Sequence, residues 1–132
     1  MATFNQKIPF SITVFNPCDG GEFVDLTGVA HVVSHVSTDN NGGFHVVSHF
    51  NTQALEGKGS LTGTRYVGRM SDTLSSNAKP PFPNEFTAES SFTLISLGQA
   101  PNFQVHTTIH LTVNANGVPT AAFAHFDSSC RG

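Results

Sequence analysis

This chain has little charge and no concentration of charge of either sign. Asp, Glu, Lys and Arg make up 11% of its residues, less than half of the usual share of about a quarter. The net charge is -3 with the histidines neutral. The six basic residues are spread over the whole chain, which excludes the basic footprint of a nucleic-acid-binding protein. No run of roughly 18 apolar residues occurs, which excludes a transmembrane helix and membrane insertion through one.

Several catalytic and metal-binding motifs are also missing. There is no GxSxG, HExxH or CxxC segment and no compact Cys/His cluster, so serine hydrolases, zinc peptidases and thiol redox enzymes lose their usual signatures. The two cysteines, Cys18 and Cys130, lie near the two ends. They are either two thiols of a cytosolic protein or one disulfide of an exported one. No signal peptide is visible, and Met1-Ala2-Thr3 is typical of an expression start, so we expect a secreted protein whose leader is absent from this sequence.

The abundant residues are those of an all-β domain. The chain contains 12 Phe, 12 Gly and 7 Pro but no Trp, and many segments alternate between apolar and polar residues. We expect one domain over residues 1–132, built as a single antiparallel up-and-down β-barrel of about seven or eight strands, with a β-sandwich as the alternative. The expected strands are Lys7–Asn16, Glu22–Ser37 with a bend or break at Thr27-Gly28, Phe44–Thr52, Leu61–Asp72, Phe86–Gly98, Asn102–Asn114 and Val118–Asp127; Gln53–Ser60 is expected as a loop or weakened strand and Thr73–Asn84 as irregular.

Four of the seven histidines lie in the first expected hairpin. Alternation puts His31 and His35 on one face of the first arm, and His45 and His49 on one face of the second. A turn centred on Asn40 would make His31 face His49 and His35 face His45. Directly opposite side chains in an antiparallel pair have Cβ atoms roughly 4.5–5.5 Å apart. The register therefore predicts two close pairs of imidazoles.

The last expected hairpin groups three more histidines with a carboxylate. A two-residue turn at Asn116-Gly117 makes His106 face Asp127 and places His125 diagonally between His106 and His110. An imidazole moves protons near neutral pH, and an adjacent Asp would hold it in one tautomer. His106, Asp127 and His125 are therefore the candidate catalytic residues. The alternative is an exposed surface of Thr, His and Asp.

The pattern leaves open which face of the sheet the histidines occupy. In the first hairpin the opposite face is the more apolar one, which favours histidines on the outside. Histidines on the inside would instead line a mostly apolar cavity and hold a small ligand by a few hydrogen bonds. The candidate ligand-binding residues are then His31, His35, His45, His49, His106, His110, Arg65 and Tyr66.

Metal binding is a further possibility for the first hairpin. Neutral imidazoles that converge bind zinc or copper, with each nitrogen about 2.0–2.1 Å from the metal. The candidate metal ligands are His31, His49, His35 and His45. No other cofactor is expected.

Three segments carry a resemblance to a family of small secreted bacterial proteins. They are NPCDGGEFVDLTG near the start, LTGTRY in the middle and HTTIHLTVNANG before the late Cys130. The resemblance covers nearly the whole chain, and the family is mostly uncharacterised. It implies export and a bridge between Cys18 and Cys130, but no reaction. The expected architecture is also similar in shape to lipocalins and to allene-oxide-cyclase-like barrels, a likeness that does not carry function.

These observations lead to three expectations for function. The first is a secreted β-barrel, monomeric or homodimeric, that binds a small, largely apolar molecule. The second is a cofactor-free barrel enzyme of the cyclase or isomerase type that uses His and Asp for proton transfer. The third is a metal-binding protein with a histidine site.

Overall fold

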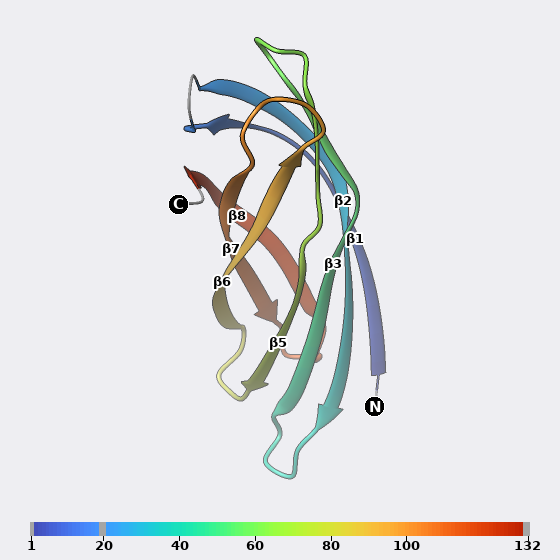
Figure 1. The fold of residues 1–132 in the computed structure, drawn as a ribbon. Helices are drawn as coiled ribbons and strands as arrows, with labels where there is room; N and C mark the ends of the chain where they lie inside the picture. The colour runs from blue at the N-terminus through green and yellow to red at the C-terminus, as the bar shows by residue number, and fades with distance from the viewer. Residues whose placement is uncertain (1, 19–20, 131–132) are drawn as a thin grey trace.

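The computed structural model describes residues 2–18 and 21–130, which form eight β-strands and no helix (Figure 1). No helix long and apolar enough to cross a membrane occurs among these residues. The expected all-β class is confirmed. The strands are β1 (Ala2–Asn16), β2 (Glu22–Thr38), β3 (Phe44–Gly59), β4 (Arg65–Gly68), β5 (Ser71–Ala78), β6 (Asn84–Ser96), β7 (Phe103–Val113) and β8 (Pro119–Cys130).

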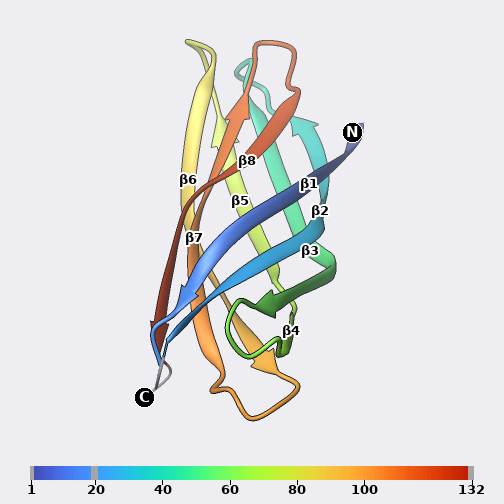
Figure 2. The ribbon, with the colours of Figure 1, turned by 90° about the horizontal axis from the view of Figure 1, so that it is seen from above.

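All eight strands belong to one antiparallel sheet, in the order β1-β2-β3-β4-β6-β7-β8, with β5 paired to β3. The long strand β3 pairs with two different strands along one of its edges. Its first part, Phe44–Asn51, pairs with β5, and its later part, Leu55–Lys58, pairs with β4. The sheet curls so that β1–β3 lie opposite β6–β8 (Figures 1 and 2).

The two edge strands, β1 and β8, meet without forming a backbone ladder among the described residues. Instead, the Gln6 side chain takes the place of a peptide group. Its Nε2 donates to the Ala121 carbonyl at 3.0 Å, and its Oε1 accepts from the Ala121 N–H at 3.0 Å. At one end of the same seam, Cys18 and Cys130 form a disulfide. The expected disulfide is confirmed. The backbone ladder does not close between β1 and β8 in the described residues, so the sheet does not decide between the expected barrel and its sandwich alternative.

Aromatic and aliphatic side chains fill the space inside the curled sheet. The largest fully buried side chains include Phe50, Phe103 and Leu26. A space of only about 10 Å³ among these side chains is apolar, and its volume is about the least that one water molecule needs. This space is too small for an organic ligand. The residues around this space are Phe10, Thr52, Met70, Phe92, Thr107, Phe123 and Phe126.

The middle of the chain departs from the expected strands. The predicted strand Leu61–Asp72 is wrong: it splits into a loop and the short strand β4. The stretch Thr73–Asn84, predicted to be irregular, contains most of β5. Its sequence SDTLSSNA has few residues with high strand propensity, so its strand conformation depends on the ladder that β3 offers.

The first hairpin has a longer loop than predicted, and this changes the histidine register. Asp39 donates its N–H to the Gly43 carbonyl at 3.0 Å. Its carboxylate accepts from the N–H groups of Asn41 and Gly43, each at 2.8 Å. The loop thus closes over five residues, and Thr38 pairs with Phe44. The predicted direct pairs of histidines are wrong, because each histidine faces a residue two positions away from the predicted partner: His31 faces Asn51, His35 faces Val47, His45 faces Ser37 and His49 faces Val33.

The last hairpin closes in the same way. Asn114 N–H donates to the Val118 carbonyl at 3.2 Å, and its side chain accepts from Asn116 N–H and Val118 N–H at 2.9 and 3.0 Å. The predicted two-residue turn is therefore wrong, and Val113 pairs with Pro119. Each loop has a glycine with positive φ at its fourth position, Gly42 at 79° and Gly117 at 74°, where a side chain would be strained.

A bulge in β8 then compensates for the longer loop. Between Thr107 and Thr108 the register shifts by one residue, so His125 on β8 has no partner in the ladder. His125 has a φ of 55°, which is uncommon for a residue other than glycine. Beyond the bulge His106 faces Asp127, as predicted. The other predicted neighbour is wrong: His125 leaves the regular face that His106 and His110 share, and His110 faces Ala122.

Candidate functional site

The seven histidines lie on the outer face of the curled sheet, not in its interior. On β2 and β3 the buried residues are those of the opposite face, such as Val32, Val36, Val46 and Phe50. The structure thus follows the alternative with outward histidines. The histidines of β2 and β3 still share one face, because the register differs from the predicted one by two residues, an even number. His45 and His125 are exposed, and His31, His35, His49, His106 and His110 are half-buried.

Only one close histidine pair forms in the first hairpin. The rings of His35 and His49 have centroids 5.7 Å apart and meet edge to face at 68°. His49 faces Val33, two residues before His35, so the pair is diagonal. His31 and His45 have no such ring contact. Nδ1 of His45 instead lies 2.8 Å from the Asn77 side-chain oxygen on β5.

Of the candidate catalytic residues, His106 and Asp127 pair across the ladder, whereas His125 lies in the bulge of β8. His106 and Asp127 are opposite one another, yet His106 Nε2 hydrogen-bonds with the Ser129 hydroxyl at 3.0 Å. Asp127 and His125 are exposed. His110 Nδ1 lies 3.3 Å from a carboxylate oxygen of Glu85, with no hydrogen bond between them. The side chains predicted for proton transfer therefore face solvent.

No group of three or more His, Cys, Asp or Glu side chains in residues 2–18 and 21–130 is arranged to hold a metal ion. Of the four candidate metal ligands, the structure brings together only His35 and His49. The two remaining candidate ligand-binding residues, Arg65 and Tyr66, do not form a common site either. Arg65 is exposed and forms an ion pair with Glu56 at 2.6 Å, whereas Tyr66 is fully buried.

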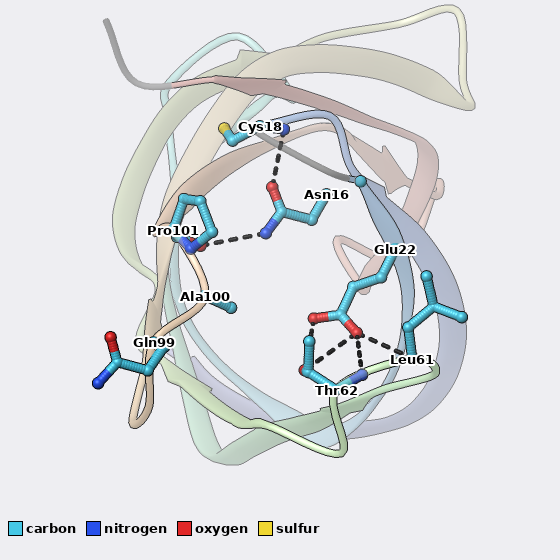
Figure 3. Close-up of a pocket in the computed structure, with 9 residues that line it drawn as sticks. Asn16, Cys18, Glu22, Leu61, Thr62, Gln99, Ala100 and Pro101 are labelled. Atoms are coloured by element: carbon cyan, nitrogen blue, oxygen red, sulfur yellow. Dashed lines mark hydrogen bonds between the residues drawn. The ribbon is translucent and has the colours of Figure 1, made fainter.

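A pocket of about 290 Å³ opens at the end of the sheet that carries the disulfide (Figure 3). Asn16 ends β1 and Glu22 begins β2, and the two residues pair directly in the ladder. The loop between β3 and β4 and the loop between β6 and β7 complete the wall. The lining residues are Asn16, Cys18, Gly21, Glu22, Leu61, Thr62, Gln99, Ala100 and Pro101.

The Glu22 carboxylate is buried and tied to the loop between β3 and β4. It accepts hydrogen bonds from the N–H of Leu61 (3.1 Å) and Thr62 (3.0 Å), and from the Thr62 hydroxyl (2.9 Å) and the Tyr66 hydroxyl (2.7 Å). Burial alone would raise the pKa of this carboxyl, but the hydrogen bonds from Thr62, Tyr66 and Leu61 outweigh burial and hold its pKa below the usual value. Glu22 is therefore an anion that anchors a loop.

Asn16 and Tyr66 complete this polar network. Asn16 Nδ2 donates to the Tyr66 oxygen at 3.2 Å and to the Pro101 carbonyl at 3.1 Å, and its Oδ1 accepts from Cys18 N–H at 3.0 Å. Burial and the neighbouring Glu22 raise the pKa of the Tyr66 phenol, so this hydroxyl keeps the proton that it donates. The network joins both ends of the β1–β2 turn to the two loops that form the pocket (Figure 3).

The polar groups in the wall of the pocket therefore have few free hydrogen-bonding positions for a ligand. Glu22 and Asn16 direct their hydrogen bonds to partners within the protein. The groups left to contact a ligand are the apolar side chains of Leu61, Ala100 and Pro101, with the exposed Gln99 amide at the rim.

The same end of the molecule carries the exposed large apolar side chains of the described residues. They come from the end of β1, the start of β2, the end of β6 and the two pocket loops, which gather at the lower end in Figure 2. Phe15 and Phe23 face each other with ring centroids 5.0 Å apart. We call this end the apolar pole; it is defined by Phe15, Phe23, Leu61, Ile95 and Leu97.

One signal in the sequence points to this site. Glu22 alternates in phase with Val24 and Leu26, which are on the inward face of β2. The pattern therefore places a carboxylate at a position that is usually apolar, and a buried carboxylate needs hydrogen-bond donors. The donors themselves lie about 40 residues further along the chain, and no local pattern marks them.

Comparisons with known proteins add no relative to this description. No protein-family model matches the chain, and neither the curated proteins nor the solved structures include a match.

Proposed function

We propose that this protein is an exported, disulfide-bonded binding module that takes a small, largely apolar molecule at the pocket of the apolar pole. Export is supported by the disulfide between Cys18 and Cys130, since such bonds persist in oxidising compartments. The close packing of the side chains inside the sheet and the pocket at its end support a site at the mouth of the sheet.

The observation that carries the proposal is that the buried polar residues of the pocket wall bind partners within the protein, whereas an apolar residue at its rim is open to solvent. The charged and amide groups of Glu22 and Asn16 are satisfied inside the protein, whereas Leu61 is 77% exposed at the rim. An apolar side chain held in water beside a concave surface gains free energy when a ligand covers it. The binding energy of this site would then come from apolar contact.

The size of the pocket limits the ligand. A volume of about 290 Å³ is at the small end of the range of roughly 300–1,000 Å³ for small-molecule sites. Because the Glu22 carboxylate already has four donors, we expect an uncharged ligand and not a cation. A ring system with one hydrogen-bonding group fits this description.

The test is a titration with N-phenyl-1-naphthylamine, an uncharged apolar dye whose fluorescence rises when it leaves water. We expect saturable binding to the folded protein. Covering about 60 Å² of Leu61 would contribute about 1.5 kcal/mol, which is roughly tenfold in Kd. Leu61→Ser should therefore weaken binding of the dye about tenfold.

Leu97→Ser is the matched control, because Leu97 is also exposed at the apolar pole but does not line the pocket. Its Kd for the dye should stay within about twofold of the parent protein. Equal losses in the two variants would mean that the dye covers the pole without using the pocket, and an absence of saturable binding would reject the site outright.

A further inference from the structure

The outer face of β2 and β3 contains a pair of histidines that the apolar pole does not involve. His35 and His49 lie on adjacent strands in a diagonal relation, with ring centroids 5.7 Å apart. Both are half-buried, so each ring packs on the sheet while keeping part of its edge in water. The pair is close enough for both rings to act on one bound group.

Each ring of the pair is held at Nδ1 by a threonine on the strand farther out. His35 Nδ1 lies 3.3 Å from the Thr3 hydroxyl on β1, and His49 Nδ1 lies 3.2 Å from the Thr73 hydroxyl on β5. The two contacts approach from opposite sides of the pair. In both rings the second nitrogen, Nε2, has no hydrogen bond to the described protein. A histidine that binds a metal through one nitrogen usually donates from the other to such a partner.

The ring spacing fits a shared ion. With a metal–nitrogen distance of about 2.0–2.1 Å, each imidazole centroid lies about 3.2 Å from the metal, so two rings on one ion have centroids at most about 6.4 Å apart. The observed 5.7 Å corresponds to an angle of about 125° between the two centroids at the metal, which is open but within reach of a distorted tetrahedral site.

The surroundings decide which kind of ion suits this pair. The outward residues of the flanking strands next to it are Thr3 and Asn5 on β1 and Thr73 and Ser75 on β5. These residues provide no carboxylate, so Ca²⁺ and Mg²⁺ lack the oxygen ligands that they need. Imidazole nitrogens favour Cu²⁺ and Zn²⁺, with Cu²⁺ bound more tightly.

We propose that His35 and His49 bind one Cu²⁺ or Zn²⁺ ion through their Nε2 atoms, with water completing the coordination. Thr3 and Thr73 accept hydrogen bonds from the Nδ1–H groups and hold both rings in the metal-binding tautomer. Two protein ligands make this a readily exchangeable surface site, unlike a buried structural zinc centre. The site is about one strand length from the apolar pole, so the two sites can be tested separately.

The experiment is a calorimetric titration of the disulfide-bonded protein with CuCl₂ in a buffer that does not coordinate metals, at pH 7.5. We expect one Cu²⁺ per chain. His35→Ala and His49→Ala should each weaken binding about tenfold or more, because the second imidazole acts at a high effective concentration once the first is bound. The affinity of the double variant for Cu²⁺ should lie within about twofold of the affinity of either single variant.

The matched control is His31→Ala, since His31 is a half-buried histidine on the same face of β2 that has no ring contact with another histidine. It should bind Cu²⁺ within about twofold of the parent. If His31→Ala loses as much affinity as His35→Ala, the ions are scattered over the histidine face and the proposal is wrong. Binding that survives His35→Ala or His49→Ala within twofold would also overturn it. His35→Gln and His49→Gln replace any alanine variant that does not fold.

The threonines provide a second, independent readout. Thr73→Val keeps the shape of the side chain but removes the hydroxyl that faces His49 Nδ1, and partners of this kind usually change metal affinity by about 10–100-fold. At this exposed position we expect a loss of several-fold. Ser75→Ala, on the same face of β5 but opposite Val47, should leave Cu²⁺ affinity unchanged. Equal effects of the two changes would remove the role assigned to Thr73.

Discussion

The buried hydroxyl of Tyr66 gives the sharpest test of the network behind the pocket. Tyr66→Phe removes the donor that lies 2.7 Å from Glu22 Oε2 while keeping the ring in its place against Phe103. A hydrogen bond to a charged group contributes about 1.5–3 kcal/mol. Asn16 loses an acceptor too, but its amide still donates to the Pro101 carbonyl, so the added loss is small. We expect Tyr66→Phe to lower the free energy of unfolding by about 2–3 kcal/mol at pH 7.

The assay is urea unfolding followed by far-ultraviolet circular dichroism with the disulfide intact. Circular dichroism is needed because the chain has no Trp and one Tyr, so the substitution itself removes the fluorescence signal. The slope of the transition should not change, which would show that the variant unfolds from the same compact state. A loss below about 0.5 kcal/mol would refute the conclusion that Tyr66 stabilises an ionised carboxylate.

The pH dependence of this loss tests the same network in another way. Because the folded pKa of Glu22 is lowered, its charge contributes stability that is complete above the ordinary pKa of 4.5 and disappears as pH falls through the lower folded value. At acidic pH, once the folded Glu22 carboxyl is protonated, the cost of Tyr66→Phe should therefore fall toward about 1 kcal/mol, typical of a neutral hydrogen bond. Glu22→Gln, as a partner in a double-mutant cycle, should remove most of the difference between Tyr and Phe. A cost that is equal at both pH values would contradict the assignment of the charge to Glu22.

Two further predictions concern the loops and the disulfide. Gly42→Ala and Gly117→Ala each place a side chain at nearly the same positive φ, which costs about 1–2 kcal/mol. Only at Gly117 would the new Cβ also meet Phe44, at 2.6 Å, so urea unfolding should show that Gly117→Ala costs about 1–3 kcal/mol more than Gly42→Ala. Equal losses in the two variants would contradict the loop geometry. Replacing both Cys18 and Cys130 by Ser should lower the free energy of unfolding by about 4–5 kcal/mol, because the bond spans 112 residues; a loss below about 1 kcal/mol would show that the unfolded chain is already restrained.

The sequence pattern predicted the strands whose side chains alternate and missed those whose strand conformation comes from a neighbour. Alternation located β2, β6, β7 and β8 but left open which face of the sheet the histidines occupy, and the expected bend at Thr27-Gly28 is a bulge between Thr27 and Val29. The strand β5 escaped prediction, because its residues are small and polar and its ladder partner lies in β3. The split between β4 and β5 also depends on the two parts of β3, which no local pattern reveals.

The register of the histidines failed for a chemical reason. The Asp39 carboxylate and the Asn114 amide each bind two backbone N–H groups within their own loop. A loop of this kind is longer than the turn that the glycines alone predict. The pairing of His106 with Asp127 was correct only because the bulge at His125 offsets the longer loop. The pocket could not be predicted, since Glu22 and its donors are brought together by the registers of β2 with β3 and of β3 with β4, which no local pattern fixes.

The fastening of β1 to β8 has a mechanical consequence. Residue 2 lies at the end of β1 opposite Cys18, and Cys130 ends β8 beside it. A force that pulls residue 2 away from residue 130 passes along β1 and then through the sulfur–sulfur bond, so residues 19–129 carry no tension. Only the 17 residues from 2 to 18 lie in the loaded path, which reaches at most about 60 Å and is already largely extended as β1, whereas the reduced chain can extend to about 450 Å. Under load, the oxidised protein behaves as a short tether with a protected body, because the strand that carries the tension, β1, is already extended.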